Sequence, residues 1–489
     1  MAAMRLVRIR AVIRVAMLLP VAIVCSCGAD DGPIRDRIRA EVEAARVPAY
    51  VTRNKDSRKL WTSTRDFYRA RAFAPVWLHR GNATSKMKTL LAAIKQADRD
   101  GLDPAVYDAG VTDERGRDRT RFTEENVGEV EVRVTLAYMQ FASDLADGVS
   151  DLARSHPAWR VRPQSFDAAA HLTQALADGR IAESLDALRP KNREYRVLAE
   201  LLADYRKRAD DGASAAGADG VPVAERIKQI ALNMERWRWL PREPVATYIV
   251  VNIPAFRLDL WEGDTVKLSM RVVVGKKDTP TPIFNDSMTH IVFSPYWNVP
   301  PTIAKGETLP SALRDPSFLN RTNMEVLDEK GQVVDADSID LERATDYRFR
   351  QRPGKGNALG TVKFMFPNEF NVYLHDTPAA SLFMRATRSF SHGCVRVEQP
   401  QALAEHLLKD HAEWTREAIA AAMHAANERT VKLREPVPVY IGYWTADVTP
   451  DSQVAFLPDV YGLDARQTDA MDQRLARARF QSRIASNER

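Results

Sequence analysis

The sequence predicts a multidomain α+β protein, in which an α-helical N-terminal domain precedes a mostly β domain. The chain has 489 residues, enough for two or three domains that each bury a core. Between residues 47 and 210 the apolar residues recur mostly at helical spacing, whereas from residue 248 onward apolar and polar residues alternate in several short segments. The apolar and charged fractions, 45% and 28%, are ordinary for a globular protein and argue against disorder.

The first 27 residues have the layout of a signal peptide. Four arginines precede an apolar run from Val15 to Val24, which is short for a membrane span. The run ends in Val24-Cys25-Ser26-Cys27, which resembles a lipobox with Cys27 as the modified residue. We therefore predict an exported, periplasmic lipoprotein, held at the inner or outer membrane through a lipid on Cys27. Ordinary signal-peptidase cleavage nearby is the alternative.

Net charge argues against a nucleic-acid partner. The chain carries a formal charge of +5, but four of those charges are arginines of the signal peptide, which leaves about +1 for the rest. The sequence has no basic stripe and no nucleic-acid motif.

The helical part is bounded by two polar segments. Residues 28–46 are arginine-rich and are predicted to be a linker, and the helical domain is expected over residues 47–210. One of its apolar stripes is Tyr195, Leu198, Leu201, Leu202 and Tyr205. Residues 211–224, rich in Ala, Gly and Asp, are predicted to be a second linker.

The mostly β domain is expected over residues 225–464. Alternation around a turn at Glu262–Asp264 predicts a β-hairpin, and a strand ending at Leu374 delivers His375. For Trp237 and Trp239, packing against this domain is favoured over a substrate-binding aromatic pair. Residues 465–489 are polar and predicted to be a tail with a loose helix.

The chemistry is concentrated in His375 to Val397, whose sequence is HDTPAASLFMRATRSFSHGCVRV. Cys394 is the only cysteine outside the signal junction, and a lone thiol in an exported protein risks oxidation, which favours a reactive role. A thiol attacks a carbonyl as thiolate and needs a nearby base, for which His375 and His392 are candidates. Gly393 allows a tight turn and leaves its amide, with that of Cys394, to hold an oxyanion. An inert buried cysteine is the plainer alternative.

The pattern of a histidine, a spacer and then Ser-His-Gly-Cys-x-Arg resembles the signature of the L,D-transpeptidases with a YkuD-type catalytic domain. The resemblance implies a mostly β catalytic domain, with residues 304–355, charged and irregular except for a small hairpin at residues 329–331, as a lid or a plain surface insertion. FAPVWL (73–78), DGLDPAVY (100–107) and ASDLADGVSD (142–151) resemble the N-terminal scaffold domain of the long Gram-negative members. Longer relatives usually insert a small peptidoglycan-binding domain near residues 209–222, where this chain has no room for one.

The resemblance also implies roles for individual residues. Cys394 is the expected nucleophile, and His375, nineteen positions earlier, the expected general base and acid. Expected support comes from the Asp376 carbonyl, which orients the imidazole, from the Tyr373 hydroxyl as an oxyanion donor, and from Ser391 and His392, which shape the loop. Arg396 either binds a substrate carboxylate or braces the turn, and Arg388 is equally open. No metal or cofactor is implied.

The resemblance implies a cysteine acyltransferase that joins peptidoglycan stem peptides through 3→3 cross-links. Water, a free D-amino acid or a lipoprotein lysine as acceptor would instead give a carboxypeptidase, an exchange enzyme or an anchoring enzyme. A non-catalytic cell-wall scaffold is the alternative from another class. Expected partners are stem peptides, a membrane and other cell-wall synthesis proteins.

Overall fold

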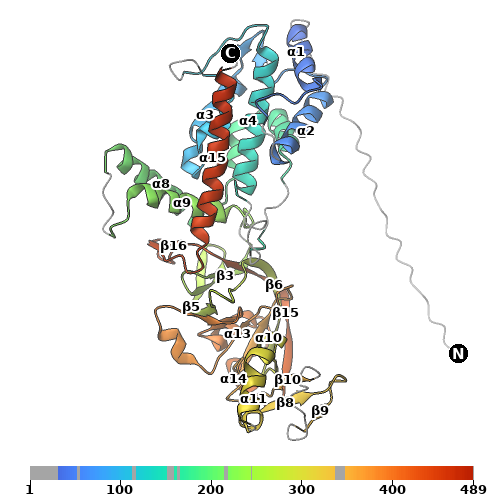
Figure 1. Ribbon diagram of the computed structural model, residues 1–489, viewed down its shortest axis with the longest axis vertical. Coiled ribbons are helices and arrows are strands. Elements are labelled where there is room, and N and C mark those ends of the chain that lie inside the picture. The colour runs from blue at the N-terminus through green and yellow to red at the C-terminus, as the bar shows by residue number, and fades with distance from the viewer. Residues whose placement is uncertain are drawn as a thin grey trace, which may run out of the picture.

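The computed structural model describes residues 31–51, 55–112, 117–150, 159–161, 166–213, 219–243, 245–315, 317–335 and 347–487. Within these ranges a helical N-terminal region is followed by a mostly β domain, which confirms the predicted fold class (Figure 1). None of the described helices is long and apolar enough to cross a membrane. The predicted signal peptide and Cys27 lie outside the described residues.

The N-terminal region is built around one long helix that is buried on most sides. This helix is α4 (Val127–Asp147), and Val132, Val134, Phe141 and Leu145 on it are fully buried. The helices that share its apolar core are α1 (Gly32–Glu43), α2 (Lys55–Ala70), α3 (Ser85–Lys95), α6 (Ala168–Asp178) and α7 (Ile181–Asp186). A short ribbon of β1 (Leu78–His79) and β2 (Asn82–Ala83) precedes α3.

The predicted linker over residues 28–46 is wrong for most of its length. It contains α1, whose Ile34, Ile38 and Val42 are at most 5% exposed and join the core around α4. These side chains repeat at every fourth position and form a stripe one residue wide on the helix. The charged residues between them mask that stripe in the sequence.

Two helices at the junction form a hairpin that joins the two regions. They are α8 (Arg193–Asp210) and α9 (Val223–Trp237). The stripe Tyr195, Leu198, Leu202 and Tyr205, expected in the helical domain, instead packs in a core shared with strands of the β domain. Trp237 stacks on Trp444 with ring centroids 4.5 Å apart, and Trp239 meets Trp159 edge-on at 5.0 Å. The packing role predicted for both tryptophans is confirmed.

The β domain is a nine-stranded sheet that curls until β4 pairs with β5. In spatial order the strands are β13 (Ser389–Ser391), β5 (Thr265–Gly275), β14 (Val395–Val397), β12 (Leu374–His375), β11 (Val362–Met365), β6 (Phe284–Phe293), β15 (Arg429–Gly442), β3 (Thr247–Asn252) and β4 (Arg257–Glu262). The predicted hairpin is confirmed as β4 and β5. Helices α13 (Pro400–Leu407) and α14 (Arg416–Met423) pack against the same core.

Alternation along the strands separates a core face from an outer face. Val362, Phe364, Leu374, Val395 and Val397 point into the core. Because successive side chains on a strand point to opposite faces, the residues between them lie on the outer face. The chemistry-bearing residues of β11, β12 and β14 are therefore on the face away from the core.

The segment after β6 forms a small subdomain, seen at the end of the molecule opposite α1 (Figure 1). Its elements are β7 (Trp297–Asn298), α10 (Pro301–Ile303), a π-helical turn (Ala304–Thr308), α11 (Leu309–Arg314), α12 (Phe318–Arg321), β8 (Met324–Leu327), β9 (Val333–Val334) and β10 (Arg348–Gln351). The predicted small hairpin is confirmed as β8 and β9. The irregularity expected over 304–355 is wrong for the described part, because Val299, Ala312, Leu319, Val326 and Phe349 form a core of their own.

The helix predicted for the C-terminal tail is confirmed, and its described part is held against the helical region. After the hairpin of β16 (Ala446–Val448) and β17 (Val454–Phe456), helix α15 (Leu463–Asn487) leaves the β domain and runs back beside α4 (Figure 1). The Arg474 guanidinium forms an ion pair with Asp144 of α4 at 2.6 Å and donates to the Val149 carbonyl. Among the side chains described up to residue 476, these polar contacts hold the helix against α4.

Candidate active site

The parallel pairing of β12 with β14 brings the two halves of the motif together. Leu374 pairs with Val395, and His375 with Arg396. Tyr373 and Cys394 each lie two residues earlier along the chain, so strand alternation puts all four polar side chains on the outer face. The rings of Tyr373 and His375 are 5.8 Å apart, as this arrangement requires. Strand pairing thus brings together the two ends of the long spacer that separates His375 from Ser391 in the sequence.

The turn before the cysteine depends on glycine. Gly393 has a φ of +120°, a conformation that residues with a side chain rarely adopt. The Ser391 hydroxyl sits inside this turn, where it donates to the Cys394 carbonyl at 2.5 Å and accepts from the Gly393 amide at 3.1 Å. The expectation that the Gly393 amide is free for an oxyanion is therefore wrong, because Ser391 already uses it.

The backbone after His375 orients its imidazole. Nδ1 of His375 lies 2.6 Å from the Asp376 carbonyl oxygen, so the Nδ1 proton is held there and Nε2 is left to accept a proton. The Asp376 carboxylate does not touch the imidazole. It accepts hydrogen bonds from the amide and hydroxyl of Thr361 and from the Thr377 amide.

Electrostatics keep the imidazole neutral. His375 is 4% exposed, and this burial, together with the nearby Arg396 cation, lowers its pKa to about 3. A neutral imidazole at neutral pH is the form that accepts a proton.

The thiol is also neutral at rest. Cys394 is half-buried, and burial raises its pKa, opposed by a backbone hydrogen bond from Tyr373 and by the charge of Arg396. Its Sγ lies 3.8 Å from the Asn371 carbonyl, to which a thiol can donate. Burial and the proximity of Cys394 raise the pKa of the Tyr373 phenol, which stays protonated and able to donate.

The two arginines differ in their surroundings. In the described part of the chain, Nε of Arg396 is buried without a hydrogen-bond partner, and the charge of this residue acts on both Cys394 and His375. Arg388 donates to the carbonyls of Arg385 and Phe256 and lies over the Phe256 ring. Arg388 therefore links two backbone segments, and no contact of this residue supports a role in substrate binding.

His392 points away from the sheet toward the small subdomain. Its Nε2 is 2.9 Å from a carboxylate oxygen of Glu307, in the π-helical turn. This contact joins the π-helical turn to the motif, and the term lid is kept as a label for the described part of residues 304–355.

Sequence reasoning missed the residues that reach this site from elsewhere. Lys363 is directly opposite His375 on β11, hence on the same face, and strand alternation alone would have found it. Glu307, and Thr281, whose hydroxyl donates to the Gly393 carbonyl at 2.8 Å, carry no local signal of their role.

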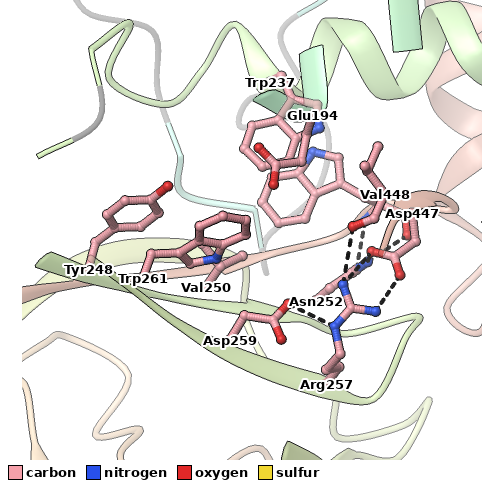
Figure 2. A pocket seen from close by; sticks show the side chains of 11 residues that line it. Glu194, Trp237, Tyr248, Val250, Asn252, Arg257, Asp259, Trp261, Asp447 and Val448 are labelled. Atoms are coloured by element: carbon pink, nitrogen blue, oxygen red, sulfur yellow. Dashed lines mark hydrogen bonds and ion pairs between the residues drawn. The ribbon is translucent and has the colours of Figure 1, made fainter. Parts of the chain in front are cut away.

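A small pocket lies elsewhere, between α8, α9 and the strands β3 and β4 (Figure 2). Tyr248, Trp261 and Trp237 line it. The Arg257 guanidinium bridges Asp259 and Asp447 there, so these three charged side chains of the pocket are already paired with one another. We assign this pocket to packing at the junction.

Comparison with known proteins finds two domains in this chain that match family models. Residues 62–202 match the family model of the Scaffold domain, and residues 246–439 match that of the L,D-transpeptidase catalytic domain. A Haemophilus influenzae protein assigned by inference as an L,D-transpeptidase is 27% identical over 404 residues, which cover 81% of this chain and 77% of that protein.

Solved L,D-transpeptidases also align with part of the chain. The enzyme from Mycobacterium smegmatis is 14% identical with a TM-score of 0.19, over 40% of this chain and 58% of that chain. Mycobacterium tuberculosis L,D-transpeptidase 1 is 15% identical with a TM-score of 0.17, over 40% of this chain and 60% of that chain.

The fold and site define a multidomain protein whose β domain carries a thiol and an imidazole on its outer face. That β domain is an L,D-transpeptidase catalytic domain, and a Scaffold domain precedes it in the chain.

Proposed function

We propose that this chain cross-links the stem peptides of peptidoglycan, with Cys394 as nucleophile and His375 as general base and acid. The observation that carries the proposal is the pairing of β12 with β14, with His375 opposite Arg396 and its Nδ1 held by the Asp376 carbonyl. The neutral imidazole and neutral thiol suit a mechanism in which the proton moves as the thiol attacks.

In the acylation step, the thiol attacks the carbonyl between diaminopimelate and the terminal D-alanine of a tetrapeptide stem. The S–C bond forms while His375 takes the thiol proton. The C–N bond then breaks as His375 returns that proton to the D-alanine amine, which leaves a thioester on Cys394.

In the transfer step, the side-chain amine of a second stem attacks the thioester. Its proton passes to His375, the S–C bond breaks, and the thiolate is reprotonated, which yields a 3→3 cross-link. The Cys394 amide and the Tyr373 hydroxyl stabilise the oxyanion in both steps, and one such donor is typically worth about 3 kcal/mol. Arg396 binds a substrate carboxylate, which the position of its cation beside Cys394 supports.

Mass spectrometry of the products formed from disaccharide-tetrapeptide by the full chain and by its Cys394→Ala variant tests the proposal. Dimers linked between diaminopimelates, formed only with Cys394, are the expected result. Loss of D-alanine without dimers would identify an L,D-carboxypeptidase, and incorporation of added D-amino acid an exchange enzyme. No reaction from either protein would favour the non-catalytic cell-wall scaffold.

The N-terminus carries a separate proposal. We propose that the chain is exported to the periplasm and lipidated at Cys27, on the basis of the Val24-Cys25-Ser26-Cys27 sequence. Metabolic labelling with a lipid precursor is expected to mark the wild type and not Cys27→Ser. Equal labelling of both proteins would contradict lipidation.

A further inference from the structure

A buried threonine lies directly behind the Gly393 turn. Thr281 is fully buried, and its hydroxyl donates to the Gly393 carbonyl at 2.8 Å. The same oxygen accepts from the Gly275 amide at 2.8 Å. The single hydroxyl proton is thus committed to Gly393.

The loop that carries Thr281 is held in place by Tyr461, a residue near the C-terminal end of the β domain. The Thr281 amide donates to the Tyr461 hydroxyl at 3.2 Å, and that hydroxyl donates to the Gly275 carbonyl at 2.8 Å. A methyl group on Gly275 would lie 2.2 Å from the Thr279 carbonyl oxygen, so glycine permits the close packing of this loop.

The hydrogen bond to the Gly393 carbonyl fixes a peptide plane. The described chain has no cis peptide bonds, so the Gly393 carbonyl and the Cys394 N–H point in opposite directions. With the carbonyl held toward Thr281, the Cys394 N–H must point away from it. Ser391 occupies the Gly393 amide, whereas within the described residues the Cys394 amide has no acceptor.

We propose that Thr281 is a positioning residue that aims the Cys394 N–H at the oxyanion formed during acyl transfer. The inference deepens the proposed function and rests on its use of Cys394 as the acylated nucleophile. A valine at this position would keep the shape but leave the Gly393 carbonyl without its donor and the peptide plane free to rotate.

The test compares two reactions of the thiol in the full chain. With p-nitrophenyl acetate the S–C bond forms, the C–O bond breaks through a tetrahedral oxyanion, and the thiol proton ends on p-nitrophenolate. Alkylation by iodoacetamide also consumes the thiolate but has no oxyanion. The ratio of the two rates therefore reports the oxyanion donor separately from the thiol pKa, and Cys394→Ala gives the background of each.

In Thr281→Val we expect the ratio to fall about 10- to 100-fold, the range for a displaced catalytic group. Thr281→Ser, which keeps the hydroxyl, is expected to restore it. Thr445→Val removes another fully buried hydroxyl of the β domain and is expected to leave the ratio unchanged. If Thr281→Val does not fold, Tyr461→Phe is expected to lower the ratio through the same loop.

An unchanged ratio in Thr281→Val, or a loss that Thr281→Ser does not restore, would overturn the inference. The outcome is independent of the natural substrate. If the wild type fails to act on disaccharide-tetrapeptide while the ratio falls as expected, the proposed function fails and the role of Thr281 stands.

Discussion

The reactivity of Cys394 depends on charges that act on it and on His375 in different ways. Arg396 lowers the pKa of both groups, which favours thiolate but also favours neutral imidazole. Burial acts in opposite directions on the two, because it disfavours the charged form of each: it raises the thiol pKa and lowers that of the imidazole. A resting thiolate–imidazolium pair is therefore disfavoured. The thiol proton moves to the imidazole only as the sulfur attacks the carbonyl.

The pH dependence of alkylation tests this account. Because the pKa of the Cys394 thiol is raised, the thiolate fraction keeps growing with pH through the ordinary range of a cysteine and beyond it. We expect the rate of alkylation by iodoacetamide to rise continuously from pH 6 to pH 9 and beyond, with about tenfold per pH unit as its limit. Arg396→Met should move the curve to higher pH, because it removes the cation that favours thiolate.

Arg388→Met is the matched control, since it removes a cation that is held on backbone carbonyls and is not among the charges that act on the thiol. Its alkylation curve should superimpose on that of the wild type. A rate that is already constant between pH 6 and pH 8 would reveal a preformed thiolate and contradict the account.

At the scale of elements, the lid contacts the motif through Glu307 and His392. Glu307 lies in a π-helical turn, a type of turn often found at functional sites. The two side chains are 58% and 34% exposed, so their contact contributes at most about 1 kcal/mol to stability. A contact of this strength suits a lid that opens, and we propose that the lid is mobile.

Hydrogen exchange tests the role of this contact. In Glu307→Gln we expect faster exchange of amides at residues 304–314 and unchanged overall stability, because only the lid loses a contact. Glu329→Gln, on the turn between β8 and β9, removes the same charge from the lid and should leave that exchange as in the wild type. Equal exchange in the two variants would mean that the contact between Glu307 and His392 does not hold the lid.

Elements with a strong periodic signal could be predicted from the sequence, and weakly patterned ones could not. The hairpin of β4 and β5 has strict alternation, so its position was recoverable. Helix α1 buries a stripe one residue wide, and α15 docks through polar groups, so neither carries the broad apolar face that marks a packed helix.

The same distinction holds within the site. His375 and Cys394 belong to one recognisable motif, whereas Thr281 is 112 residues from Gly393 and meets it only through the folded sheet. The occupation of the Gly393 amide by Ser391 depends on the rotation of one side chain, which a sequence does not specify.

At the scale of the whole molecule, buried polar contacts join the helical region to the β domain. Glu235 of α9 is fully buried and accepts from the Ser150 amide at 2.8 Å, while it pairs with Arg238 at 2.9 Å. Arg238 in turn donates to the Tyr195 hydroxyl. Buried charges are costly unless paired, so these contacts favour one placement of α9 against the helical region.

Helix α15 also links the β domain to the helical region, and a substitution of its Arg474 tests this link. The Asp144 side chain is 3% exposed and accepts from the Tyr107 hydroxyl at 2.8 Å as well as from Arg474. In Arg474→Met, Asp144 keeps the phenol but loses its cation, so the free energy of unfolding should fall by about 2 kcal/mol. Urea unfolding of the full chain, followed by tryptophan fluorescence, measures this loss. Arg208→Met breaks an exposed pair with Asp204 and should cost at most about 0.5 kcal/mol. If both variants unfold at the same urea concentration, α15 does not join the two regions.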